Sequence, residues 1–140
     1  MARDYRPNVR ESAVISKLDH KKEAQRNRAL SELRENHETM SDQIAMKLIE
    51  DKLVDTTSKS ELENQIYHCL EELLSAEEFE INLATANIRT LVPRPHFVSL
   101  YLTAYIIEKL IDHKCIVDIY GTDLEIYSSV NKQVLRWVSL

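Results

Sequence analysis

Glycine and proline, which most often end helices and form tight turns, are scarce in this sequence. The 140 residues include one glycine, Gly121, and three prolines. β-Sandwiches and β-barrels need many glycine-dependent turns, so this composition argues against a mainly-β fold. A single glycine also excludes a glycine-rich phosphate-binding loop. Neither residue occurs between Pro7 and Pro93, which favours helices joined by short polar turns.

Cysteine and long apolar runs are scarce as well. The two cysteines, Cys69 and Cys115, cannot form a disulfide framework, and we expect both to be reduced and buried in a cytoplasmic protein. The first ten residues contain no apolar segment and cannot act as a secretory signal. A membrane span needs ~20 apolar residues. The uncharged run from Phe97 to Ile107 has only 11 residues, so we expect no membrane partner.

The stretch FVSLYLTAYIIEKLI, from Phe97 to Ile111, is the segment around which we expect the chain to fold. Its apolar residues cover most of the circumference of a helix, which is typical of a buried helix. The stretch is about twice as long as a usual strand of ~4–8 residues. Pro93 and Pro95 precede it, and proline suits a helix start because the first turn has no use for its missing N–H. We predict a buried central helix over residues 96–112.

Further helices are predicted on both sides of this one. A helical apolar face covers residues 33–48, and we expect that helix to end near Val54, where turn-forming residues begin. Ser58 and Thr122 each stand three residues before a glutamate, the spacing of a capping box, and each predicts a helix start. Ser75 has the same spacing, and we predict a further helix from there to about residue 90.

The segment 115–120, CIVDIY, is rich in β-branched residues and is compatible with a strand. A lone strand would leave its backbone groups without partners, and the alternating segment 79–83 is the plausible pairing partner. Otherwise these residues extend the central helix, with Gly121 as its C′ residue. The predicted fold is an all-α bundle around the helix at 96–112 with a peripheral N-terminal helical arm. The alternative is an α+β fold with a two-stranded ribbon that pairs 79–83 with 115–120.

Charge is distributed unevenly along the chain. Residues 1–35 hold nine Lys/Arg and six Asp/Glu, whereas residues 36–92 hold four and twelve; residues 93–140 are balanced at five and five. Such segregation is typical of an interaction arm or of two segments that attract each other. We therefore divide the chain into a charged N-terminal helical arm (residues 1–36) and a helical bundle domain (residues 37–140).

The apolar stripe of the arm is thin. In a single helix, Ile15, Leu18, Ala29 and Leu33 fall within a narrow arc, which Lys22 and Arg26 interrupt. Such a stripe cannot bury a helix fully, so we expect either a peripheral helix or an arm that folds against a partner.

The arm also carries a basic stripe. In a helix with 100° per residue, Arg10, Lys17, Lys21 and Arg28 fall along one line, because they are spaced by seven, four and seven residues. A line of cations can bind the phosphates of a nucleic acid or an acidic protein surface, although charged helix faces are often merely solvated. The candidate polyanion- or partner-binding residues are Arg10, Lys17, Lys21, Lys22, Arg26 and Arg28.

Metal binding and catalysis find little support in the sequence. His68-Cys69 and His113-Lys114-Cys115 contain zinc-ligand residue types, but structural zinc sites space paired ligands by two or more residues, and helical neighbours point about 100° apart. The paired glutamates resemble solvated helix faces rather than a pocket with shifted pKa values. We expect no catalytic residue, no metal, no cofactor and no small-molecule substrate.

The predicted function is a non-enzymatic protein–protein interaction or assembly module. In this hypothesis the N-terminal arm mediates self-association, which would give a homo-oligomer, or docking of a protein partner. The alternative hypothesis is a small nucleic-acid-associated protein that uses the basic stripe of the arm.

Overall fold

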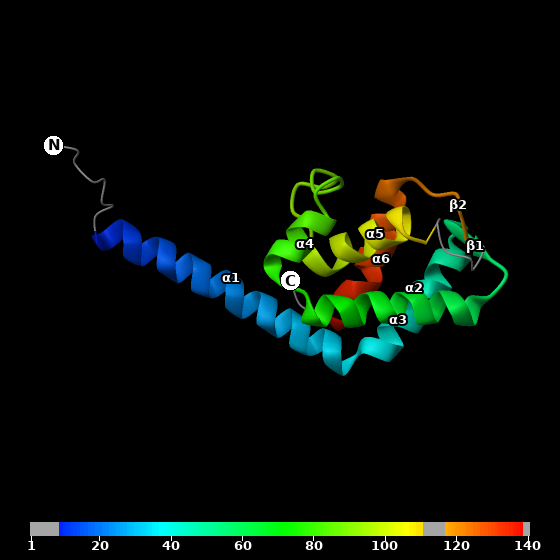
Figure 1. Cartoon of the computed structure of the whole chain (residues 1–140), viewed down its shortest axis with the longest axis horizontal. Coiled ribbons are helices and arrows are strands. Elements are labelled where there is room, and N and C mark those ends of the chain that lie inside the picture. Colours follow the sequence, from blue (N-terminus) through cyan, green and yellow to red (C-terminus); the bar gives the residue numbers. More distant parts are fainter. Residues whose placement is uncertain (1–8, 111–116, 139–140) are drawn as a thin grey trace.

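A computed structural model of the chain describes residues 9–110 and 117–138, with side chains from residue 21 onward. These residues form a mostly helical fold, as the sequence predicted, together with a short two-stranded ribbon, which the sequence analysis gave as the alternative (Figure 1). The elements, in chain order, are α1 (Val9–Glu35), α2 (His37–Glu50), β1 (Val54–Thr56), α3 (Lys59–Ser75), α4 (Glu78–Ala84), α5 (Phe97–Glu108), β2 (Val117–Ile119) and α6 (Asp123–Trp137).

Four helices enclose the core. α2 packs on α3 and α6, and α5 packs on the same two helices, so the four form a closed bundle. α4 covers α5 at one end, and the ribbon lies at the opposite end (Figure 1). α1 packs on α2 and α3 only near its C-terminal end. In the parts of the chain that the structure describes, no helix combines the length and apolar character needed to cross a bilayer.

α5 is the buried central helix that the sequence predicted. Seven of its residues are buried: Val98, Ser99, Leu100, Leu102, Thr103, Ala104 and Ile106. His96 caps its N-terminus, because the His96 ring Nδ1 accepts from the Val98 N–H at 3.2 Å. The Tyr127 hydroxyl of α6 accepts from the His96 N–H at 3.0 Å and fixes this cap against the bundle. The helix ends at Glu108, earlier than predicted, and residues 111–112 lie outside the described part.

The ribbon pairs β1 with β2, so the predicted pairing of 79–83 with 115–120 was wrong in its first strand. Val54 lies opposite Ile119 and Thr56 opposite Val117, in antiparallel register. The segment 79–83 is helical and belongs to α4. β-Branched residues stand at all four of these ribbon positions and suit an extended backbone.

α2 ends at Glu50 rather than near Val54, because the chain reverses in a Schellman motif. Lys52 adopts a left-handed backbone with φ of 59°. Its N–H donates to the Ile49 carbonyl at 3.0 Å, and the Leu53 N–H donates to the Leu48 carbonyl at 3.0 Å. These two bonds satisfy the last carbonyls of the helix and release the chain into β1.

Two of the three predicted helix caps are confirmed. The Thr122 hydroxyl accepts from the Glu125 N–H and the Glu125 carboxylate accepts from the Thr122 N–H, which completes a capping box for α6. The Ser58 hydroxyl accepts from the Glu61 N–H and starts α3. Ser75 is not a cap: its hydroxyl donates to the Glu72 carbonyl at the end of α3.

The helix that follows Ser75 is also shorter than predicted, since α4 ends at Ala84 rather than near residue 90. The Arg89 side chain caps this end of the helix. Its guanidinium folds back and donates to the Asn82 carbonyl at 3.1 Å and to the Thr85 hydroxyl at 3.1 Å. A cation at a helix C-terminus satisfies exposed carbonyls and complements the helix dipole.

Gly121 is not the C′ residue of a helix, because it follows β2. Its N–H donates to the Leu53 carbonyl at 3.1 Å, beside the Tyr120 N–H, which donates to the same oxygen at 2.9 Å. A Cβ at this position would lie 2.7 Å from Leu53 Cδ2. The single glycine therefore leaves room for the Leu53 side chain to pack directly against the chain after β2.

Candidate interaction surface on the N-terminal helix

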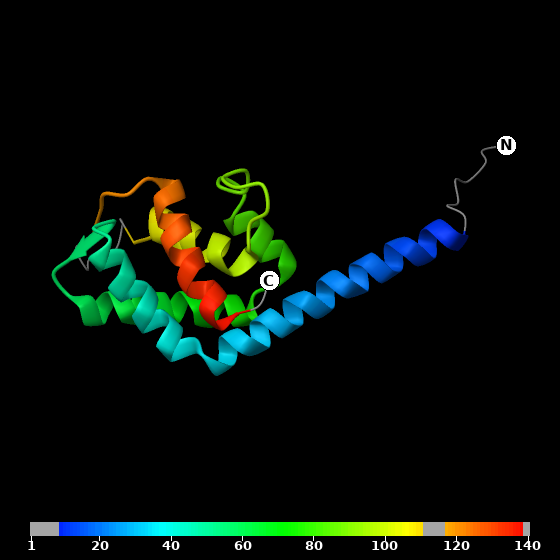
Figure 2. The ribbon, with the colours of Figure 1, turned by 180° about the vertical axis from the view of Figure 1, so that it is seen from behind.

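α1 extends away from the bundle. It has 27 residues, which corresponds to a rod about 40 Å long. Ala29 and Leu33 are buried and belong to the main core. From Lys21 to Arg28 every side chain except Arg26 is exposed. Figures 1 and 2 show from opposite sides that the helix leaves the bundle beside α4 and projects beyond it.

Arg26 anchors the helix where it leaves the bundle. Its guanidinium makes an ion pair with Glu78 of α4, with a distance of 3.3 Å from Nη1 to Oε2. The same group lies 5.4 Å from the centre of the Phe97 ring at the start of α5. The His96 ring stacks on Phe97 with centroids 5.3 Å apart. Arg26 interrupts the apolar stripe of the arm because this position faces an acidic and aromatic surface rather than an apolar one.

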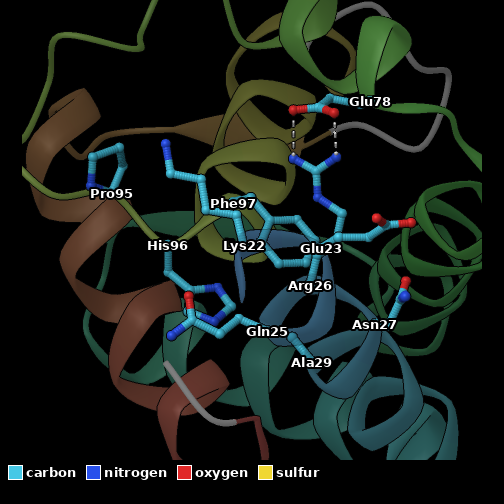
Figure 3. A pocket seen from close by; sticks show the side chains of 10 residues that line it. All are labelled: Lys22, Glu23, Gln25, Arg26, Asn27, Ala29, Glu78, Pro95, His96 and Phe97. Atoms are coloured by element: carbon cyan, nitrogen blue, oxygen red, sulfur yellow. Dashed lines mark hydrogen bonds and ion pairs between the residues drawn. The ribbon is translucent and has the colours of Figure 1, made fainter. Parts of the chain in front are cut away.

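A groove of about 840 Å³ lies between α1, α4 and the start of α5. Figure 3 shows its lining side chains, with Arg26 facing the Glu78 carboxylate across the groove. Lys22 and Glu23 also line it, so cations and carboxylates alternate around an open space. Groups of mixed charge suit a protein contact better than catalysis, which needs titratable groups in a water-excluding pocket.

The structure divides the predicted binding residues between two sides of α1. Lys22 and Arg26 are brought together at the groove. Lys21 and Arg28 are exposed on the other side of the helix. Arg10 and Lys17 lie within the helical backbone of α1, on the line of Lys21 and Arg28, but their side chains are outside the described residues. The six residues are therefore not one patch.

An acidic surface lies next to the groove. Burial raises the pKa of Tyr101 in α5 to about 12, and the nearby carboxylates of Glu72 and Glu80 add to this shift. The effect places Glu72 of α3 and Glu80 of α4 on the same side of the bundle. Both glutamates are exposed. This side therefore presents carboxylates next to the basic helix.

Phe79 and Leu83 of α4 are two surface residues that the sequence reasoning missed. Their exposed fractions are 71% and 68%, whereas Ile81 between them is buried. The alternation of the three apolar residues suggested a strand. The available signal was the spacing of four between Phe79 and Leu83, which places both on one face of a helix.

The thiol of Cys69 is buried, as predicted, and burial raises its pKa well above the usual value. A buried neutral thiol behaves as a small apolar side chain and is a poor nucleophile or metal ligand. His68, next to it, is exposed. His113 and Cys115 lie outside the described residues. Across the described chain, no three His, Cys, Asp or Glu side chains converge as a metal site would require.

Comparison of the chain with protein-family models, with curated proteins and with solved structures finds no match in any of the three. The surfaces of α1 and its neighbours are therefore the basis on which a function can be proposed.

Proposed function

We propose that the protein is a non-enzymatic helical assembly module whose N-terminal arm mediates self-association or the docking of a protein partner. The observation that carries this proposal is the projection of α1 beyond the bundle (Figures 1 and 2). The protein is proposed to act in the cytoplasm, in keeping with the reduced, buried Cys69.

A projecting helix gains stability when a partner packs on it, because most helix stability in proteins comes from packing of an apolar face. The buried side chains of α1 that the structure describes are Ala29 and Leu33, both in its C-terminal part. The side chains from Lys21 to Gln25 are all exposed and gain little from their own bundle, and a second chain that covers the arm would supply burial there.

Size-exclusion chromatography with light scattering tests the proposal, comparing the full chain with a variant that lacks residues 1–24. The deletion stops before Arg26, so that Ala29 and Leu33 keep their places in the core. We expect a full-length mass that is a multiple of 16.3 kDa and a monomeric truncated protein. If the two proteins have the same oligomeric state and the same binding partners, the arm has no assembly role.

Nucleic-acid binding is the second candidate function. It is favoured by the continuity of α1 from Val9 to Glu35, which keeps positions 10, 17, 21 and 28 on one line, with Lys21 and Arg28 exposed. Charge reversal at Lys17, Lys21 and Arg28 would then abolish binding at low salt, and the affinity of the unaltered protein would fall steeply with added salt.

The matched control reverses three exposed cations on the bundle, Arg94, Lys132 and Arg136. It produces the same change in net charge away from the arm and is expected to weaken binding much less. Fluorescence anisotropy with labelled DNA and RNA duplexes and single strands measures both variants. No binding by the unaltered protein at low ionic strength would exclude this function.

A further inference from the structure

The outer face of α4 has an apolar pair with no cover in the described structure. Phe79 and Leu83, one helical turn apart, are exposed, and Ile81 on the opposite side of the helix anchors α4 to the core. Together with Tyr120, at the ribbon end of the molecule, they are the most exposed large apolar side chains among the described residues. Adjacent large apolar side chains at a spacing of four suit the docking of another helix.

The surroundings of this pair are acidic. α4 and its N-cap contain Glu77, Glu78 and Glu80, and Glu72 of α3 lies on the same side of the bundle. No lysine or arginine occurs between Lys59 and Arg89. An apolar pair within a purely acidic segment favours a partner helix that presents apolar residues next to cations.

The arm of this chain has that composition. In a helix, its sequence places Val14 and Leu18 beside the basic line that includes Lys17 and Lys21, with Ile15 further round the helix beyond Leu18. The chain already contains one contact of this type, because Arg26 of α1 pairs with Glu78 of α4 at 3.3 Å. A basic residue of the arm therefore already pairs with an acidic residue of α4 within one molecule.

On the basis of the proposed function, we propose that the Phe79–Leu83 face of α4 is the docking surface for residues 9–24 of α1 from a second copy of this chain. The arm cannot cover its own α4 face in this way. α1 is one continuous helix from Val9 to Glu35, held at its C-terminal end by Leu33 and by Arg26, and its N-terminal part extends past α4. It would have to break to fold back.

The geometry suits a two-fold dimer. The arm leaves the bundle at the α4 end, so each copy carries its own arm and the α4 face that receives the other copy's arm on the same side (Figure 1). A two-fold axis would place each arm on the other copy's α4 and close the assembly at two chains. Stable interfaces bury ~1,600 Å² in total.

Sedimentation velocity over a range of concentrations tests the proposal with full-length proteins. One variant carries Phe79→Ser and Leu83→Ser on α4, and another carries Ile15→Asp and Leu18→Asp on the arm. The matched control carries Tyr120→Ser and Leu124→Ser, which removes two exposed apolar side chains at the other end of the bundle. We expect a dimer whose dissociation constant rises at least tenfold in the first two variants and by less than twofold in the control.

A photo-reactive amino acid in place of Leu83 locates the contact. Mixing ¹⁵N-labelled and unlabelled protein identifies cross-links between chains, and we expect the linked peptides to come from residues 9–24 of the other copy. Cross-links to any other region of the second copy would overturn the inference.

The outcomes also separate this inference from the proposed function. If the α4 variant remains a dimer while the arm variant dissociates, the arm docks elsewhere: the inference is overturned and the assembly role stands. If the unaltered protein is a monomer at every concentration, the inference and the self-association role are both wrong. Circular dichroism of each variant verifies that the bundle is intact.

Discussion

Replacement of Arg26 by alanine tests how α1 is held on the bundle. The Arg26 and Glu78 side chains are 26% and 69% exposed. An ion pair with this exposure is worth ~0.2–1 kcal/mol. The guanidinium over the Phe97 ring adds roughly 0.5–1 kcal/mol. We therefore expect Arg26→Ala to lower the free energy of unfolding by about 1 kcal/mol, which lowers the Tm by ~2–4 °C for a domain of this size.

Arg28→Ala is the matched control, because Arg28 lies two residues further along the same helix and is exposed on the other side. The same residue change then has the same effect on helix propensity, and we expect a change within about 0.5 kcal/mol. Urea denaturation followed by circular dichroism, at a concentration where the protein is monomeric, measures both. In 1 M salt the ion-pair part of the Arg26 effect should largely vanish. Equal stability of the two variants would refute the anchoring role of Arg26.

Three further predictions concern the bundle. Leu33→Ala removes a fully buried side chain and should lower the free energy of unfolding, measured by urea denaturation, by ~2–5 kcal/mol. Leu83→Ala, at an exposed position, should change the stability of the monomer by less than about 0.5 kcal/mol. Equal effects of the two changes would contradict the assigned burial. Gly121→Ala would place a Cβ 2.7 Å from Leu53 Cδ2, so we expect the free energy of unfolding to fall by ~1–3 kcal/mol. Adding Leu53→Ala should remove part of this loss. If the effects of the two changes simply add, the steric explanation is wrong. Burial raises the pKa of Tyr101 from 10.0 to about 12; a folded-state pKa above the unfolded one means that stability present below pH 10 is lost as the pH rises toward 12. Tyr101→Phe should therefore reduce the loss of stability between these pH values, and an unchanged pH dependence would contradict it.

The central helix and two helix starts could be predicted from the sequence, because their signals are local. The apolar run after Pro95 has no alternative to burial in a chain of this composition. The hydroxyls of Ser58 and Thr122 cap helices through groups only three residues away. Such short-range bonds can be predicted without knowledge of the rest of the fold, although Ser75 shows that the same spacing does not always form a cap.

The elements whose bounds or pairing the sequence analysis predicted wrongly depend on residues outside the element or on a backbone conformation that is rare for their residue type. The ribbon joins Val54 to Ile119, which are far apart in the sequence, and no local pattern indicates that pairing. The reversal that ends α2 uses Lys52 at positive φ, where glycine is the usual signal. α4 ends at Ala84, where the Arg89 side chain folds back and caps it.

The candidate surface was predicted only in part. Charge counting identified the basic arm, and α1 is one helix through all six predicted positions. The division of those residues between two sides follows from the docking of Ala29 and Leu33, which fixes how the helix is rotated on the bundle. The sequence analysis did not predict that Phe79 and Leu83 are exposed, because apolar residues are normally assigned to the core.

Hydrogen–deuterium exchange of the full-length protein, measured as a function of protein concentration, tests the assembly role of the arm most directly. At high dilution we expect the amides of residues 9–24 to exchange fast, because a helix without tertiary packing is only weakly stabilised in water. As the concentration rises and chains associate, residues 9–24 and the α4 segment, Glu78–Ala84, should become protected together, while α5 stays protected throughout. Exchange of the arm that does not depend on concentration would contradict self-association through α1.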